Sequence, residues 1–477
     1  MMKIRNRDQL LSHGERESRR IVLDVAEATL QRLDSYRRIR SIADMDGSIL
    51  HIGRRSWDLA TKRHVYLVGS GKACNHMARA VEDVLGDYLT QGIIIVKIAE
   101  DSDTFTRTEV HVGGHPIPNE TGYAASLRIL ELVDSCTPDD LVIGVISGGS
   151  SALMSCPVDG ITLQDEMAAT DVLLKSGAGI YEINAIRRHI SRMNGGRLAQ
   201  RIQATGAEFI GFGISDAVGT APTGDIGVPY ENYASTPIGP DRTTLDDARR
   251  CIKDYDLAEQ LPASIVDYLV NADDTQETPK AFPDNTYFLI NTLPDSCRYA
   301  KEAAEDLGLN AIILSSFLEG ESKDAGAFFA AVAKEITHYG NPVHGPCLLI
   351  SAGETTTRIV DSNAIAGHGG PGQELVVGFA LLAAGAPGAC MLSIDSEGTD
   401  GTAPAAGGIC DSTTLAAAVE AGVDLRAALR GHASFEALEA VGDVVLTGNT
   451  GTNLCDFNLL YVPGTDRSSG RLKGQQP

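Results

Sequence analysis

Residues 65–74 read VYLVGSGKAC, an apolar run that stops at Gly69 and Gly71 and is followed by Lys72. A short apolar run closed by glycines is typical of a buried strand that turns into a helix. The pattern returns at residues 140–149, where DLVIGVI precedes SGG. Continuously apolar strands that alternate with helices predict a parallel sheet covered on both faces.

The alternation continues along most of the chain and predicts the fold class α/β, with two doubly wound (Rossmann-like) three-layer domains and an interdomain cleft. The long Gly- and Pro-rich segment at 215–245 interrupts the pattern and suggests the domain boundary. We expect an N-terminal domain at 1–245, a C-terminal domain at 246–465 whose last strands are free to return to the first, and a flexible tail at 466–477. Further strands are predicted at the residues 92–96, 206–215, 285–290, 310–316, 346–351, 389–395, 443–449 and 457–463.

Composition excludes several function classes. The 477 residues include 40 basic and 63 acidic side chains, a net charge of −23, with no basic stripe, so nucleic-acid binding is not expected. No apolar stretch is long enough for a membrane helix and no signal peptide is recognised, which predicts a cytoplasmic location. The nine cysteines form no C-x-x-C pair, which indicates free thiols rather than a metal site.

The loop at 69–73 (the first glycine loop) fits neither common nucleotide motif. Tyr66 and Ala73 occupy positions where a Walker loop needs Gly and Ser or Thr, and Cys74 replaces the last glycine of G-x-G-x-x-G. Two interpretations remain at this point. Lys72 and the glycine backbone grip an anion, or the loop is a plain strand–helix turn with a solvated lysine.

A second candidate loop follows the apolar run at 140–146. Its glycines and hydroxyl groups suit a phosphate. The alternative interpretation is the nucleophile loop of a serine hydrolase, but Ala152 stands where the motif G-x-S-x-G needs its last glycine. This second glycine loop consists of Ser147, Gly148, Gly149, Ser150 and Ser151.

Arginines gather in the segment at 184–197. Asn184 and Arg187 are three positions apart on a predicted helix and share a face. Arg197 follows the pair Gly195-Gly196. In a chain this acidic, such a cluster suggests an anion site, although some of these side chains are expected only to solvate a helix.

Acidic and polar residues in glycine-rich loops are candidates for holding Mg²⁺ and a nucleotide. Asp216 follows a predicted strand, and Glu354 follows another. Glu374, Asp400 and Thr402 lie in later glycine-rich segments. We expect the metal, if present, at Asp216 or Glu354.

Many segments together resemble the glycerate 2-kinase family, whose second domain is called MOFRL and whose older label is hydroxypyruvate reductase. The similarity runs from about Leu59 to Val462. The matching segments are VGSGKA, GGHPIPNETG, LVIGVISGGSSALMSCPVDGITL, LLKSGAGIYEINAIRRHIS, GGRLA, PDRTTLDDA, ISAGETTT, GHGGPGQEL, GTDGTAPAAGGICD and TGNTGTN.

The resemblance implies ATP-dependent phosphorylation of the 2-hydroxyl of D-glycerate, with Mg²⁺, at a site in the interdomain cleft. Lys72 matches the lysine that is important in the family. We expect Lys72, Arg197 and Asp216 to be catalytic, and the second glycine loop, Asn184 and Arg187 to bind substrate and phosphate. The partners implied are small molecules, not nucleic acid or membrane, and a homodimer is the candidate assembly.

Three departures from the family pattern keep alternatives open. Asn194 replaces a lysine, Pro371 and Gly372 replace an arginine and an asparagine, and Thr236 replaces a glycine. Lost cations weaken the stabilisation of a phosphoryl transition state. The alternatives are a kinase for another small hydroxy acid such as a four-carbon sugar acid, a non-kinase enzyme of the same fold, and an inactive binding protein.

Overall fold

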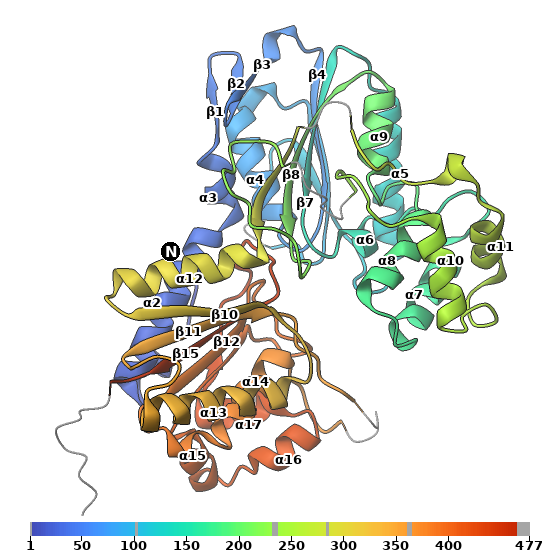
Figure 1. Ribbon diagram of the computed structural model, residues 1–477. Helices are drawn as coiled ribbons and strands as arrows, with labels where there is room; N and C mark the ends of the chain where they lie inside the picture. Colours follow the sequence, from blue (N-terminus) through green and yellow to red (C-terminus); the bar gives the residue numbers. More distant parts are fainter. Residues whose placement is uncertain (1, 101–103, 231–236, 283–285, 360–364, 465–477) are drawn as a thin grey trace, which may run out of the picture. The chain divides into compact units, whose positions relative to one another are not determined.

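The computed structural model describes residues 2–100, 104–230, 237–282, 286–359 and 365–464, and it divides into two compact units (Figure 1). Residues 34–292 and 451–454 form one, which we call the parallel-sheet unit. Residues 1–33, 293–450 and 455–477 form the other, the mixed-sheet unit. The predicted tail at 466–477 and Thr236 lie outside the described residues.

The parallel-sheet unit is built on six parallel strands in the order β6-β5-β4-β7-β8-β9. The strand order reverses between β4 and β7, which is the point where ligands bind in sheets of this kind. This confirms the doubly wound α/β prediction for the first sheet. The strands are β4 (His64–Ser70), β5 (Gln91–Val96), β6 (Thr108–Val112), β7 (Asp140–Ile146), β8 (Glu208–Ser215) and β9 (Tyr287–Thr292).

Helices cover both faces of this sheet, as continuous apolar strands require. On one face α5 (Glu120–Asp134) and α9 (Arg197–Ala204) pack against residues such as Val142 and Ile146. On the other face α3 (Ser35–Arg40) and α4 (Cys74–Leu85) approach Ile143 (Figure 1).

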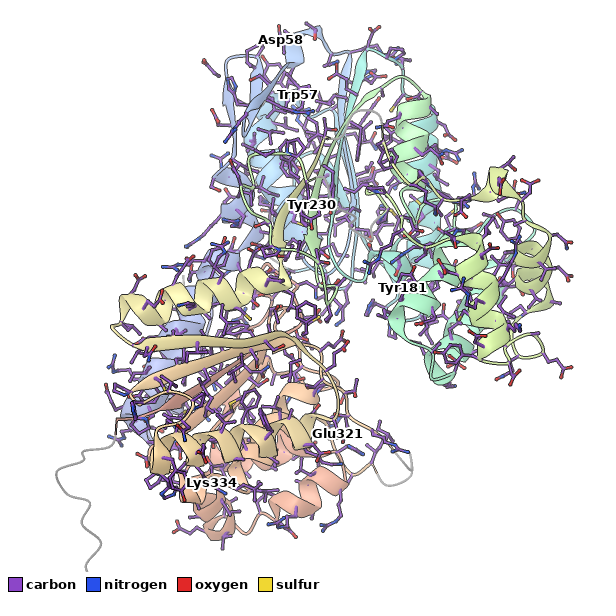
Figure 2. All side chains as sticks on the ribbon, viewed as in Figure 1. Trp57, Asp58, Tyr181, Tyr230, Glu321 and Lys334 are labelled. Carbon is purple, nitrogen blue, oxygen red and sulfur yellow. The ribbon has the colours of Figure 1, made fainter. Side chains whose placement is uncertain are left out.

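Three features of this unit were not predicted, and the first is the edge strand β6. A three-stranded antiparallel sheet precedes β4, made of β1 (Ala43–Asp46), β2 (Ile49–Ile52) and β3 (Arg55–Asp58). A helical lobe with its own apolar core contains α7 (Leu163–Lys175), α8 (Ile180–His189), α10 (Leu245–Asp254) and α11 (Ala263–Asn271). Figure 2 labels Tyr181 on α8, whose hydroxyl donates to Asp247 of α10 at 3.4 Å.

The compact units differ from the predicted boundary after residue 245. Residues 246–292 complete the parallel-sheet unit, because α10 and α11 pack in its helical lobe and β9 pairs with β8. The N-terminal 33 residues belong instead to the mixed-sheet unit. The apolar run at 285–290 was expected to open the second domain, but its residues 287–290 belong to β9, the edge strand of the first sheet.

The mixed-sheet unit has a six-stranded sheet in the order β10-β11-β15-β12-β13-β14. Among its neighbouring strand pairs, β10 and β11 run parallel and the other four pairs run antiparallel. The strand directions therefore differ from the doubly wound sheet that was expected for both domains. The expected α/β layering is confirmed. The strands are β10 (Asn310–Leu318), β11 (Cys347–Gly353), β12 (Cys390–Asp395), β13 (Gly407–Asp411), β14 (Val444–Val445) and β15 (Asp456–Val462).

Helices again lie on both faces of the mixed sheet (Figure 1). α2 (Arg16–Leu33) and α12 (Leu293–Asp306) cover one face, while α13 (Ser322–Tyr339) and α14 (Pro371–Ala380) enclose the core on the other. The remaining helices of the two units are α1 (Arg7–Leu10), α6 (Ser150–Leu153), α15 (Thr414–Glu420), α16 (Leu425–Arg430) and α17 (Ser434–Val441).

The last strands do not return to the first sheet. β15 lies between β11 and β12, and β14 pairs with β13. Only residues 451–454 belong to the parallel-sheet unit. None of the described helices is long and apolar enough to span a membrane.

Glu277 holds the helical lobe together, which gives a test of this part of the fold. Its carboxylate accepts from Lys280 Nζ at 2.8 Å and the Leu245 amide at 2.9 Å, and it contacts His189 Nε2 at 2.7 Å. Burial works to raise the pKa of Glu277, but these bonds outweigh it and lower the pKa to about 2.

We predict that Glu277→Gln lowers the free energy of unfolding at pH 7 by about 1–2 kcal/mol. The native pKa lies below the ordinary value of 4.5, so this stabilisation is present above that value and is lost as the pH falls toward 2. Urea unfolding between pH 7 and pH 3 measures it. Exposed Glu259 in the same lobe provides the control Glu259→Gln, and equal stability of both variants at pH 7 would contradict the assignment.

Candidate functional site

The two glycine loops are bonded to each other at the β4–β7 switch point. The Ser147 amide donates to the Ser70 carbonyl at 3.1 Å, and the Lys72 amide donates to the Gly148 carbonyl at 3.0 Å. The Ala73 amide donates to Ser147 Oγ at 3.0 Å. The amides of Lys72 and Ala73 are thus already occupied by the protein, so the first loop offers an anion its lysine side chain rather than these two N–H groups.

Gly148 has no space for a side chain. A Cβ atom built on it would lie 1.9 Å from Asp216 Oδ2 and 2.0 Å from Asn453 Oδ1. The carboxylate of Asp216, at the end of β8, and the buried amide of Asn453 therefore lie directly against the second glycine loop.

Gly149 brings two further side chains to the same loop. Its φ of +83° is in the left-handed region that favours glycine. A Cβ there would lie 3.0 Å from the His115 ring and 3.3 Å from Lys72 Cγ. Lys72 and His115 thus meet over one face of Gly149, and both are half-buried.

The structure therefore brings together the predicted residues Lys72, Asp216 and the second glycine loop. Sequence reasoning missed His115 and Asn453 as individual site residues. Their segments were noted only within the family resemblance, because a histidine after two glycines and an asparagine in a polar turn have no spacing that marks them as partners of Lys72.

The arginine side chains of the segment at 184–197 differ in whether other protein groups already accept their hydrogen bonds. Arg188 Nη1 donates to Asp241 Oδ1 at 2.8 Å, and Arg197 Nη2 donates to the Gln276 carbonyl. Arg187 is only 8% exposed, and its Nε and Nη2 find no acceptor among the described residues. Burial lowers the pKa of Arg187, and the nearby Glu166 carboxylate opposes that shift.

Asn194 and Asn184 occupy the same part of the unit. Asn194 Nδ2 donates to the Ser151 carbonyl at 3.3 Å and to Ser191 Oγ at 3.2 Å, so it touches the second glycine loop directly. Asn194 Oδ1 has no partner in the described part of the chain. Asn184 is half-buried on α8.

The remaining predicted residues lie in the mixed-sheet unit and are largely engaged in its structure. Asp400 accepts from the Gly372 and Gln373 amides, at 3.2 and 2.8 Å, and so caps α14. Glu374 contacts His432 Nδ1 at 2.9 Å, and the Thr402 amide donates to the Gly369 carbonyl at 2.9 Å. Glu354 is exposed at the end of β11.

No group of three or more His, Cys, Asp or Glu side chains within the described ranges is arranged to hold a metal ion. The predicted metal residues Asp216 and Glu354 belong to different compact units. All nine cysteines are free, and eight of them are buried. Burial raises the pKa of Cys156 and Cys251 to about 11, so neither is a thiolate at neutral pH.

Glycine loops at the switch point of a parallel sheet, with a lysine between them, define the class of α/β proteins that bind anionic small molecules. Comparison with known proteins then gives the family. Residues 21–270 match a domain of unknown function, DUF4147, and residues 347–456 match the MOFRL family. The chain belongs to the family of glycerate kinases with these two domains.

The similarity to individual proteins covers nearly the whole chain. The glycerate 2-kinase of Pyrococcus horikoshii is 36% identical over 447 residues, 93% of this chain and 97% of that protein. The D-glycerate 2-kinase of Thermotoga maritima is 34% identical over 395 residues, 82% of this chain and 89% of that protein. A crystal structure of glycerate kinase from Thermotoga maritima has a TM-score of 0.75 at 30% identity, covering 93% of this chain and 99% of that one.

The close approach at Gly148 predicts a strong size limit. Gly148→Ala should destabilise the protein by about 1–3 kcal/mol, because the methyl group overlaps Asp216 and Asn453 while the backbone itself suits alanine. Calorimetric melting measures the loss. Gly385→Ala is the control, since its added methyl meets only the flexible side chain of Lys334, labelled in Figure 2. Melting of Gly148→Ala at the wild-type temperature would contradict the packing described here.

Proposed function

We propose that this protein transfers the γ-phosphoryl group of ATP to the 2-hydroxyl of D-glycerate, giving 2-phosphoglycerate and ADP. Membership of the glycerate kinase family supports the reaction. The observation that carries it is the convergence of Lys72, His115 and Asp216 on Gly148 and Gly149. Phosphoryl transfer uses a lysine ammonium to neutralise phosphate charge and a carboxylate to hold Mg²⁺ or to orient the nucleophile, and both groups stand at this loop.

In this proposal Lys72 is catalytic. Its ammonium neutralises charge on the oxygens of the transferring phosphoryl group, and the Gly148–Ser151 segment holds the phosphate against it. The bond formed joins the glycerate oxygen to phosphorus, the bond broken joins phosphorus to the β–γ bridging oxygen, and the hydroxyl proton leaves to solvent. Little further acid–base chemistry is required.

Arg187 is our candidate for the glycerate carboxylate. Two of its nitrogens lack acceptors in the described structure, while Arg188 and Arg197 already donate to Asp241 and to the Gln276 carbonyl. A guanidinium matches a carboxylate through two parallel hydrogen bonds. Asn184, on the same helix, and Asn194 are further candidates for substrate contacts. Asn194 Oδ1 and Arg197 Nε both lack a partner among the described residues.

The donor set around the second loop fits Mg²⁺. Asp216 offers carboxylate oxygen, and Mg²⁺ in kinases is held by one or two carboxylates together with phosphate oxygens and water rather than by an all-protein cage. When bound, Mg²⁺ supplies charge neutralisation to the phosphates. Asp216, whose carboxylate lies against Gly148, would hold the ion. Glu354 stays the alternative metal ligand, with Glu374, Asp400 and Thr402 as nucleotide candidates.

The proposed partners are two small molecules, the hydroxy acid and the nucleotide, with a homodimer as the candidate assembly and the cytoplasm as the compartment. The nine free cysteines fit a reducing environment.

We predict that Lys72→Ala lowers kcat/KM for D-glycerate on the order of 100-fold, because charge at the transferring group is lost. A coupled ADP-release assay over three- to five-carbon hydroxy acids measures it. Lys175→Ala, which removes an exposed lysine paired with Asp171, is the control and should keep full activity.

Two results would contradict this assignment. Equal turnover of Lys72→Ala and wild type removes Lys72 from the chemistry. Turnover of a four-carbon sugar acid but not of D-glycerate would show that the protein is a kinase with a different hydroxy-acid substrate.

A further prediction concerns the acid group of the substrate. Arg187→Gln should raise KM for D-glycerate at least 10-fold with a smaller change in kcat, and it should abolish the thermal stabilisation that D-glycerate gives the wild type. Differential scanning fluorimetry with D-glycerate and with uncharged glycerol tests this. Undiminished stabilisation of the variant by D-glycerate would assign the carboxylate to another residue.

A further inference from the structure

A row of buried polar side chains crosses the sheet of the mixed-sheet unit. Ser351 of β11, Asn458 of β15 and Ser393 of β12 lie directly opposite one another in register. Residues directly opposite on antiparallel strands point to the same face. Two positions along, the same face carries Leu349, Leu460 and Met391, which belong to the apolar core with α13 and α14. The polar row therefore adjoins an apolar core.

These three side chains have no hydrogen-bond partner in the described part of the chain. Ser351 Oγ, Ser393 Oγ and both amide atoms of Asn458 are buried and unbonded. Each residue is at most 1% exposed. Buried polar atoms are normally satisfied, so several unsatisfied atoms in one row indicate an occupant such as an ion or ordered water.

The next row on the same face carries two carboxylates. Asp395 and Asp456 are direct cross-strand partners, two residues from Ser393 and Asn458 respectively. Like charges directly opposite on adjacent strands repel each other. Asp395 Oδ1 accepts from the Glu397 amide at 2.9 Å, and Asp456 is only 6% exposed. A positive charge between the two strands would remove the repulsion.

We propose that Asp395, Asp456, Ser393 and Asn458 bind a divalent cation of the oxygen-liganded class, Ca²⁺ or Mg²⁺, inside the mixed-sheet unit. The two carboxylates supply the negative charge, and the serine hydroxyl and asparagine carbonyl supply neutral oxygen ligands of the kind these ions take. A mixed set agrees with the finding that, in the described residues, no group of three or more His, Cys, Asp or Glu side chains could hold a metal ion by itself.

This ion is distinct from the metal of the proposed kinase reaction. Its ligands come from β12 and β15 alone, whereas Asp216 belongs to the parallel-sheet unit. It needs no phosphate oxygens and therefore binds without nucleotide. Its role is to join β12 to β15 near α14, since Gly372 of that helix approaches Ser393 so closely that a Cβ would lie 2.8 Å from Ser393 Oγ.

The test is isothermal titration of the full, metal-stripped chain with Ca²⁺ and with Mg²⁺, without nucleotide, together with melting curves. We expect one site per chain and a melting temperature that rises with ion concentration. Asp456→Asn should lose at least 10-fold in affinity and should melt above the metal-free wild type, because the repulsion is gone. Ser393→Ala should weaken binding less.

Two controls locate the site. Asp424→Asn, at an exposed helix cap, and Asp216→Asn, in the parallel-sheet unit, should both bind the ion as the wild type does. No binding of either ion to the wild-type chain at millimolar concentration would overturn the proposal, whatever the variants do. So would unchanged affinity in Asp456→Asn, or loss of binding in Asp216→Asn.

Discussion

At Gly148 the second glycine loop passes so close to Asp216 and Asn453 that no side chain fits, and the candidate site depends on this constraint. The loop is held there by hydrogen bonds between the two loops after β4 and β7, two to backbone carbonyls and one to the Ser147 hydroxyl. Those bonds use the amides of Lys72 and Ala73, so the first loop is a rigid support rather than a row of free donors. The first loop therefore contributes to the proposed chemistry through the side chain of Lys72.

The surrounding architecture follows from this support. A parallel sheet places the carboxyl ends of β4, β7 and β8 at one edge, where Lys72, the second loop and Asp216 meet. Asn453 reaches the same loop from residues 451–454, far along the chain. Arg187 is buried on α8 of a separate helical lobe, where its unoccupied nitrogens are protected from water.

Local patterns predicted five of the six strands of the first sheet, because those five are mostly apolar and end at a glycine or a polar turn. They missed β6, whose sequence TEVHV alternates polar and apolar residues. They failed where pairing partners decide the structure. The run at 285–290 has the same composition whether it opens a second sheet or closes the first, and only its bonds to β8 decide between them. The antiparallel pairing of β15 with β11 and β12 could not be predicted either. The composition of an apolar strand does not indicate whether it will pair in parallel or antiparallel.

The site was predicted in the same uneven way. Lys72 and Gly148 stand in glycine loops whose chemistry is local, whereas His115 and Asn453 acquire their place only through the fold. Asp400, a candidate nucleotide residue, also caps α14 through two amides that are distant in the sequence, and this structural role could not be predicted from its glycine-rich segment.

Hydrogen–deuterium exchange of the wild-type chain, with and without D-glycerate and Mg²⁺ with a non-hydrolysable ATP analogue, tests the central claim most directly. If the paired loops grip the transferring phosphate, peptides covering 69–73 and 147–151 gain protection when both ligands are present, while helix α11 at 263–271 does not change. Binding that leaves both loops exchanging at their original rates would show that the phosphate is held elsewhere.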